Sequence, residues 1–281
     1  MDKLVGLGSA GVNIVEGFIK YPQYQCYRID NDLDGLKKDG FYKIDQLSTT
    51  EEYEANCPPL KNFLKAARPE ITLFLSGCGK ISGLSLSLLE QVKDRKINIV
   101  YIKGGERRLS KRAQLTERAT FGVMQEYARS GLFESFQIVS NSALEEILGK
   151  TPVIGYYESL NSLLINTMHM VNVFDNSDPI MADFSPISGI NRISTYGFSK
   201  FGEKDEENLF FPLDNVRQKR YYFAINKKQL EVDGDINNKI DEYLNRTQEK
   251  EIDISYGIYP TNYKENFVYS RVYTNTIQEH K

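Results

Sequence analysis

The chain has 281 residues, enough for one large domain or two smaller ones with a buried core. Its 35 basic and 38 acidic residues leave a net charge of -3, which argues against broad nucleic-acid binding driven by phosphate neutralisation. Three cysteines without CxxC spacing and two distant histidines form no zinc pattern, so we expect no metal site made from them. No apolar run approaches the ~20 residues that span a bilayer, and no targeting peptide is recognisable. We therefore expect a cytoplasmic protein with reduced thiols and no membrane partner.

Apolar strands and helical patterns alternate through the first half of the chain. Strands are predicted at 3–7, 25–29, 71–75, 97–102 and 136–139, and helices at 10–19, 51–66, 83–92 and in a long stretch that ends near 129. Unbroken apolar strands separated by helices are typical of a parallel sheet covered on both faces. Residues 1–150 are therefore predicted to form a Rossmann-like α/β domain.

A connecting region follows at 151–188. Thr151-Pro152 predicts a helix start, with an N-cap followed by proline in the first turn. The helix should run to about Val173, and its apolar residues lie on more than one face, which is typical of a buried central helix. Residues 174–188 have the composition of a loop.

The last part, 189–281, changes character. A strand is predicted at 219–226, a helix at 236–244, and alternating half-buried strands at 251–259 and 267–274. This order predicts a smaller α+β domain.

Two glycine loops follow predicted strands. Residues 6–11 read G-L-G-S-A-G, a G-x-G-x-x-G pattern that lets backbone N–H groups close on a phosphate, and Asp30 ends the next strand about 20 residues later. These features alone fit a Rossmann dinucleotide site, a different phosphate ligand, or a tight turn without a ligand. Residues 76–83, S-G-C-G-K-I-S-G, form the second loop. Two such loops suggest a site that wraps a di- or triphosphate from two sides. A Walker A loop is excluded, since it needs glycine at Phe74 and a hydroxyl at Ile81.

The second loop resembles the G-G-G-T-G-[ST]-G loop of tubulins and FtsZ, with Cys78, Lys80 and Ile81 in place of a glycine, a threonine and a glycine. Residues 8–13 are similar to the G-[GC]-x-G-x-N loop of the same family, and 29–36 follow its I-N-T-D-x-x-x-L stretch. The resemblance covers the whole chain. It implies a divergent FtsZ-like member of the tubulin/FtsZ superfamily, of a kind that a phage or plasmid encodes. The implied fold has a Rossmann-like parallel-sheet GTPase domain, a long central helix and a smaller α+β C-terminal domain.

The resemblance also implies the ligand, GTP or GDP with Mg²⁺. The phosphate-binding residues that it implies are Gly8, Ser9, Ala10, Gly11, Asn13, Gly77, Cys78, Gly79, Lys80, Ile81, Ser82 and Gly83.

Residues 138–144, I-V-S-N-S-A-L, are similar to the strand-end motif whose asparagine reads guanine in this family, and 157–161 repeat the Y-x-x-L-N of its central helix. The resemblance implies that Asn141, Tyr157 and Asn161 bind guanine. An amide suits this task because it offers a donor and an acceptor to a base edge. As isolated residues, Asn141 and Tyr157 would instead be interpreted as a helix cap and a core aromatic.

Residues 181–186, M-A-D-F-S-P, resemble the N-x-D-F-A-D loop that enters the next subunit in this family and places carboxylates beside the attacking water. Asp183 is thereby implied as catalytic, whereas Met181 and Pro186 replace the asparagine and the second acid. Slow, assembly-dependent GTP hydrolysis is expected. Alone, Asp183 would be an exposed loop acid. The family also places a glutamate and an arginine on the helix after its fourth strand. The candidates for these two residues in this chain are Glu106, Arg108 and Arg112.

Three functions remain open at this point. The first is a GTP-binding protein that polymerises head to tail into cytoskeletal filaments, so that its partners are itself and guanine nucleotide, without nucleic acid or membrane. The second is a pseudo-GTPase with degenerate loops that binds or regulates a polymer. The third is a Rossmann NAD-dependent oxidoreductase, which leaves the second glycine loop unexplained.

Overall fold

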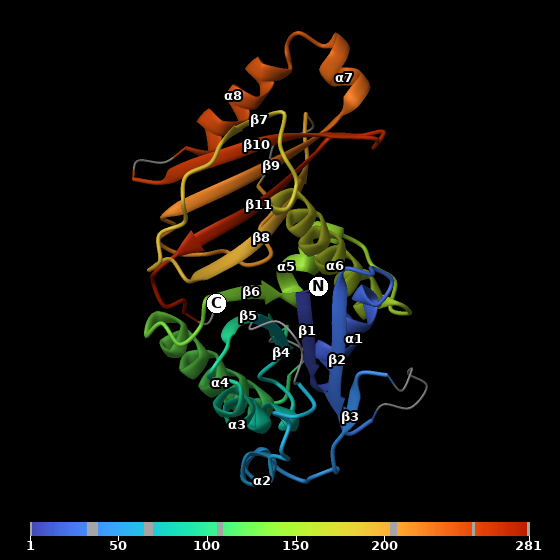
Figure 1. Cartoon of the computed structure of the whole chain (residues 1–281), viewed down its shortest axis with the longest axis vertical. Coiled ribbons are helices and arrows are strands. Elements are labelled where there is room, and N and C mark those ends of the chain that lie inside the picture. The colour runs from blue at the N-terminus through green and yellow to red at the C-terminus, as the bar shows by residue number, and fades with distance from the viewer. Residues whose placement is uncertain are drawn as a thin grey trace. The chain divides into compact units, whose positions relative to one another are not determined.

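The computed structural model describes residues 2–32, 39–64, 70–105, 109–202, 207–248 and 251–279. The chain forms two compact units (Figure 1). The first comprises Met1–Ile165 with Ile277–Lys281, and the second comprises Asn166–Thr276. Among the helices that fall in the described ranges, none is long and apolar enough to cross a membrane.

The first unit contains a parallel sheet with the strand order β3-β2-β1-β4-β5-β6. Its strands are β1 (Asp2–Leu7), β2 (Tyr24–Asp30), β3 (Phe41–Lys43), β4 (Glu70–Leu75), β5 (Lys96–Lys103) and β6 (Ser135–Ser140). The structure confirms the five predicted strands; β3 was not predicted, because three residues carry too little periodicity. Since all these strands are parallel, the loops after β1, β2, β4, β5 and β6 meet at one edge of the sheet.

The helical elements of this unit are α1 (Gly8–Phe18), α2 (Thr50–Ala55), the 3₁₀ turn η1 (Lys80–Gly83), α3 (Leu84–Gln91), α4 (Lys111–Arg129) and α5 (Asn141–Leu148). The structure confirms the predicted helices at 10–19, 83–92 and in the stretch that ends near 129, contradicts part of the helix at 51–66, and adds two helical elements that were not predicted, η1 and α5. The prediction of a helix over 51–66 is wrong beyond Ala55 as far as Leu64, the last described residue of this segment. Two prolines, Pro58 and Pro59, explain the early end, because proline lacks an N–H and disfavours helical backbone before it.

The central helix α6 (Tyr156–Asp175) starts later than predicted. Thr151-Pro152 is not its first turn, because Gly155 has a φ of +78° and this left-handed residue interrupts a right-handed helix. Val153 and Ile154, which the prediction placed inside the helix, are 92% and 94% exposed. The helix begins in the first unit and ends in the second.

The second unit contains a mixed sheet with the order β8-β11-β9-β10-β7. Its elements are β7 (Met181–Asp183), β8 (Ile193–Lys200), β9 (Gln218–Asn226), α7 (Lys227–Val232), α8 (Ile236–Thr247), β10 (Asp253–Thr261) and β11 (Phe267–Thr274). Strands β9 and β10 are parallel, and the other pairs are antiparallel. This confirms the predicted α+β character, although β8 was not predicted and β7 lies within the stretch 174–188 that was predicted to be a loop.

One face of β9 forms the core under α8. Tyr221, Phe223 and Ile225 of β9 are buried in one cluster with Ile236 and Tyr243 of α8. Side chains alternate between the two faces of a strand, so Gln218, Arg220 and Tyr222 of β9 belong to the opposite face.

Candidate functional site

The first glycine loop is the direct passage from β1 to α1. Gly8 opens the helix with a φ of +69°, a backbone conformation that glycine adopts without strain. Gly11 lies where α1 crosses β4, and a Cβ there would overlap the backbone carbonyl of Phe74. The N-cap residue of α1, Leu7, makes no side-chain hydrogen bond to the first turn, so its side chain does not compete with an anion for the N–H groups at this helix N-terminus.

The second glycine loop joins β4 to η1. The hydroxyl of Ser82 is buried and donates to the Gly77 carbonyl at 3.3 Å, which closes the loop. A Cβ on Gly77 would overlap the hydroxyl of Tyr101, and one on Gly83 would overlap the carbonyl of Thr50. Gly77, Ser82 and Gly83 therefore determine the shape of the second loop through contacts inside the first unit.

A cavity of ≈ 330 Å³ lies between the two loops. It is lined by Leu7, Gly8, Ser9, Ala10, Asp30, Asn31, Gln46, Leu47, Tyr53, Ser76, Cys78, Gly79, Lys80 and Ile81. Of these lining residues, Lys80 carries the one positive charge and Asp30 the one carboxylate. The tertiary structure thus assembles a single concave site from loops that follow β1, β2, β3 and β4.

Asp30, which the sequence singled out only for a dinucleotide site, is the carboxylate in the lining of this cavity. Its carboxylate accepts hydrogen bonds from the Ser9 hydroxyl at 3.1 Å and the Asn31 N–H at 2.8 Å. Burial raises the pKa of Asp30 above its usual value, although these hydrogen bonds act in the opposite direction. A cation beside Asp30 would offset that cost of burying its charge.

Tyr53 organises the rim next to Asp30. Its hydroxyl accepts from the Asn31 side-chain amide at 3.0 Å and from the Leu47 N–H at 3.1 Å, and its ring is buried. The contribution of Gln46, Leu47 and Tyr53 was missed at the sequence level, because no motif marks them and only tertiary contacts bring them to the glycine loops.

Ile81 lies against the first loop. A Cβ on Gly8 would overlap the Cγ2 atom of Ile81, so this side chain occupies the space directly beside Gly8. The apolar group therefore narrows the approach to the N-terminus of α1.

Five of the residues predicted to bind phosphate do not line the cavity. Gly11, Gly77, Ser82 and Gly83 shape the loops from behind, and Asn13 is exposed on α1. The other seven, Gly8, Ser9, Ala10, Cys78, Gly79, Lys80 and Ile81, line it.

The residues predicted to read guanine lie outside the lining of this cavity. Asn141 is the first residue of α5, directly after β6 at the same sheet edge as the glycine loops. Tyr157 and Asn161 stand one turn apart at the start of α6, where Tyr157 is 56% exposed. The hydroxyl of Tyr156 donates to Glu145 of α5 at 2.8 Å, which ties the start of α6 to the helix that carries Asn141.

Asp183 belongs to the second unit, where it ends β7 and is exposed. It pairs with Tyr256 in the antiparallel ladder between β7 and β10. Glu106 and Arg108 lie outside the described residues, whereas Arg112 is on α4, 3.9 Å from Glu51 in an exposed ion pair.

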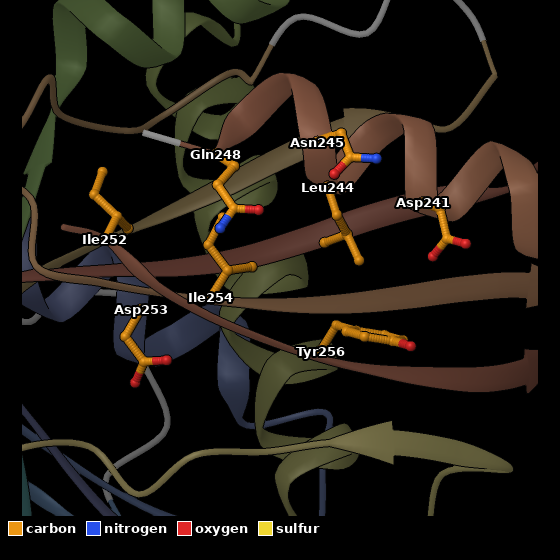
Figure 2. A pocket seen from close by; sticks show the side chains of 8 residues that line it. All are labelled: Asp241, Leu244, Asn245, Gln248, Ile252, Asp253, Ile254 and Tyr256. Atoms are coloured by element: carbon orange, nitrogen blue, oxygen red, sulfur yellow. The ribbon is translucent and has the colours of Figure 1, made fainter. Parts of the chain in front are cut away.

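A second cavity, of ≈ 430 Å³, lies in the second unit between α8 and the start of β10 (Figure 2). Leu244, Ile252, Ile254 and Tyr256 supply its apolar wall, and the remaining lining residues are Asp241, Asn245, Gln248 and Asp253. Within the described ranges, no three His, Cys, Asp or Glu residues form a group that could hold a metal, and Cys26, Cys57 and Cys78 are free thiols.

Known structures resemble this chain along almost its whole length. No family model matches the sequence, and no curated protein does. A GTPγS-form protofilament of TubZ from Bacillus thuringiensis serovar israelensis has a TM-score of 0.74 and 12% identity, over 97% of this chain and 87% of that one. CetZ2 from Haloferax volcanii, in a GTPγS-bound protofilament, has a TM-score of 0.71 and 12% identity, over 97% and 92%. An empty FtsZ dimer from M. jannaschii has a TM-score of 0.68 and 13% identity, over 96% and 87%.

Proposed function

Since the chain has the tubulin/FtsZ fold, we propose that it is a cytoplasmic GTP-binding protein that polymerises head to tail into filaments. The observation that carries this proposal is the cavity between the two glycine loops at the carboxyl edge of the parallel sheet. Ligands of open α/β sheets bind at that edge. The TubZ and CetZ2 structures are protofilaments with GTPγS, which supports both the ligand and the self-association.

The phosphates are expected between the start of α1 and the second loop. The first N–H groups of α1 carry partial positive charge, and Lys80 adds a full one. Mg²⁺ would supply further positive charge to the β- and γ-phosphates. Asp30 fits this ion, because it is the carboxylate in the cavity lining and a cation would offset the burial that raises its pKa. It would hold Mg²⁺ directly or through a water molecule.

Guanine is expected beyond this cavity, between Asn141 and the start of α6. Tyr157 offers an exposed ring for stacking, and Asn161 stands on the same side of α6 one turn later. We expect Asn141→Ala to lower GTP affinity about 10-fold, or ~1.4 kcal/mol, because it removes hydrogen bonds to the base edge. Calorimetric titrations with GTP and with ATP measure this effect. A parallel loss for both nucleotides would contradict base reading by Asn141.

Ile81 is expected to weaken phosphate binding. Its side chain lies beside Gly8, where the family's glycine would leave the backbone accessible. We expect Ile81→Ala to raise GTP affinity about five- to tenfold, ~1 kcal/mol. The exposed Ile154→Ala serves as the control for loss of an isoleucine side chain. A lower affinity in Ile81→Ala would mean that Ile81 contacts the nucleotide favourably.

Hydrolysis is expected to be slow. Asp183 would act in the site of the neighbouring subunit, where a carboxylate orients water and stabilises developing charge. Met181 and Pro186 stand where the family's loop has an asparagine and a second acid, so part of that machinery is missing.

A pseudo-GTPase that binds or regulates a polymer is the second candidate. The position of Ile81 against Gly8 favours it, since a filled approach to the first loop disfavours phosphate entry. An NAD-dependent oxidoreductase is the third candidate, and the second glycine loop in the cavity lining speaks against it.

Pelleting of purified protein with and without GTP and Mg²⁺, with phosphate release measured in the same samples, tests the proposal. Nucleotide-dependent pelleting with phosphate release is the expected result. Failure of both, with no guanine nucleotide released from denatured protein, would overturn it in favour of the pseudo-GTPase. The same denatured sample tests for NAD.

A further inference from the structure

The segment that follows Asp183, residues 184–192, is called the Asp183 segment and is held largely by side chains from one face of β9. Residues 184–192 contain no helix or strand, and their hydrogen bonds go largely to Gln218, Arg220 and Asp253. Gln218 and Arg220 are alternate residues of β9, so their side chains share the face opposite the α8 core. All of these groups belong to the second unit.

Gln218 binds the far end of the segment. Its side-chain oxygen accepts from the Ser188 N–H at 2.8 Å and from Asn191 at 2.7 Å. Its nitrogen donates to the Pro186 carbonyl at 3.1 Å and to Asp253 at 3.0 Å. Each polar atom of this buried amide therefore has two partners, so the end of the segment has one defined conformation.

Arg220 binds the end nearest to Asp183. One terminal nitrogen donates to the Ser185 carbonyl at 2.7 Å, and the guanidinium lies over the Phe184 ring, 5.0 Å from its centroid. The other terminal nitrogen lies 4.0 Å from the carboxylate of Asp175. Arg220 thus contacts both residues that directly follow Asp183, and also the last residue of α6.

Asp175 is itself fixed in place. Its carboxylate accepts from the Tyr222 hydroxyl at 2.6 Å and lies 3.7 Å from Arg271 of β11. Arg271 packs its guanidinium over the rings of Tyr196 and Tyr273. Arg220 is therefore a partner shared by the end of α6 and the Asp183 segment. Asp175, at the end of α6, is in turn bound to the sheet through Tyr222 and Arg271.

We propose that Arg220 is a positioning residue for Asp183: through Ser185, Phe184 and Asp175 it holds the Asp183 segment in one conformation relative to the end of α6. This inference rests on the proposed function, because Asp183 is assigned there as the carboxylate that acts on GTP. Arg220 itself has no contact with nucleotide in this assignment.

The test compares Arg220→Ala, Arg220→Lys and Arg217→Ala. Arg217 is a matched control on the same chain segment, since its ion pair with Glu251 at 3.6 Å is exposed. Hydrogen–deuterium exchange of residues 184–188 reports the conformation of the segment without reference to GTP. We expect about 10-fold faster exchange in Arg220→Ala, a smaller change in Arg220→Lys, and none in Arg217→Ala.

Turnover is measured in the same variants as phosphate release per assembled protein. In Arg220→Ala we expect about 10-fold slower release with unchanged GTP affinity and pelleting, and partial recovery on addition of guanidinium at low millimolar concentration. A purely structural role would reduce assembly instead and would not respond to guanidinium. Unchanged exchange in Arg220→Ala, or unchanged turnover in assembled Arg220→Ala, would overturn the proposal. Absence of both turnover and nucleotide-dependent pelleting in the unmodified protein would overturn the proposed function, while the exchange result would still decide whether Arg220 orders the segment.

Discussion

We expect Gly8→Ala to lower the affinity for GTP about 100-fold, a loss of ~2.7 kcal/mol. Gly8 has a φ of +69°, which costs an alanine about 1–2 kcal/mol. Its Cβ would also overlap Ile81, so the first loop and the second must move apart. That movement displaces the N–H groups at the start of α1 from the phosphates. Calorimetric titration with GTP and Mg²⁺, together with urea unfolding, measures the two effects separately.

Gly149→Ala is the control for backbone strain alone. Gly149 has a φ of +70°, and a Cβ there would meet no described atom within 4 Å. We expect it to lose stability, because φ +70° with ψ −137° is a backbone conformation that L residues rarely adopt, and to keep its GTP affinity. In Gly8→Ala combined with Ile81→Ala, removal of the overlap should restore part of the affinity. Unchanged GTP affinity in Gly8→Ala would show that the phosphates do not bind at this loop.

Asp183→Ala is expected to slow phosphate release about 100-fold per assembled protein, since a positioned carboxylate contributes about 10²–10⁴-fold to such a step. GTP affinity should be unchanged, because Asp183 lies in the second unit and the glycine-loop cavity in the first. Filaments of this variant should also persist after the unmodified protein, in a parallel sample, has exhausted its GTP. Phosphate release and pelleting over the same time course measure both effects.

Asp178→Ala provides the matched control, because Asp178 is another exposed acid in the segment between α6 and β7. We expect near-normal turnover from it. If Asp183→Ala and the double variant Asp178→Ala/Asp183→Ala both release phosphate at the unmodified rate, Asp183 has no catalytic role. If only the double variant is slow, the two acids substitute for each other.

The sequence alone determined the parallel α/β architecture and the place of the two glycine loops. Strands such as 71–75 and 97–102 are mostly apolar, and this local composition is sufficient to predict them because burial on both faces requires it. The loops at 6–11 and 76–83 were found because glycine marks sharp turns that other residues avoid. Short or proline-marked segments were not predicted correctly: Thr151-Pro152 has the local chemistry of a helix start, but Gly155 delays the helix to Tyr156.

The composition of the candidate site was decided only by tertiary structure. Tyr53 lines the cavity between the glycine loops and accepts hydrogen bonds from Asn31 and Leu47, and no local pattern predicts these contacts. Ile81 was recognised as a departure from glycine, yet only the fold places it against Gly8. Likewise, the sequence shows Arg220 only as a polar residue of a strand, and the fold alone brings Ser185 and Asp175 next to it. Periodicity and turn chemistry act over neighbouring residues and can be read along the chain, whereas a site made of residues tens of positions apart depends on packing that forms only when the chain folds.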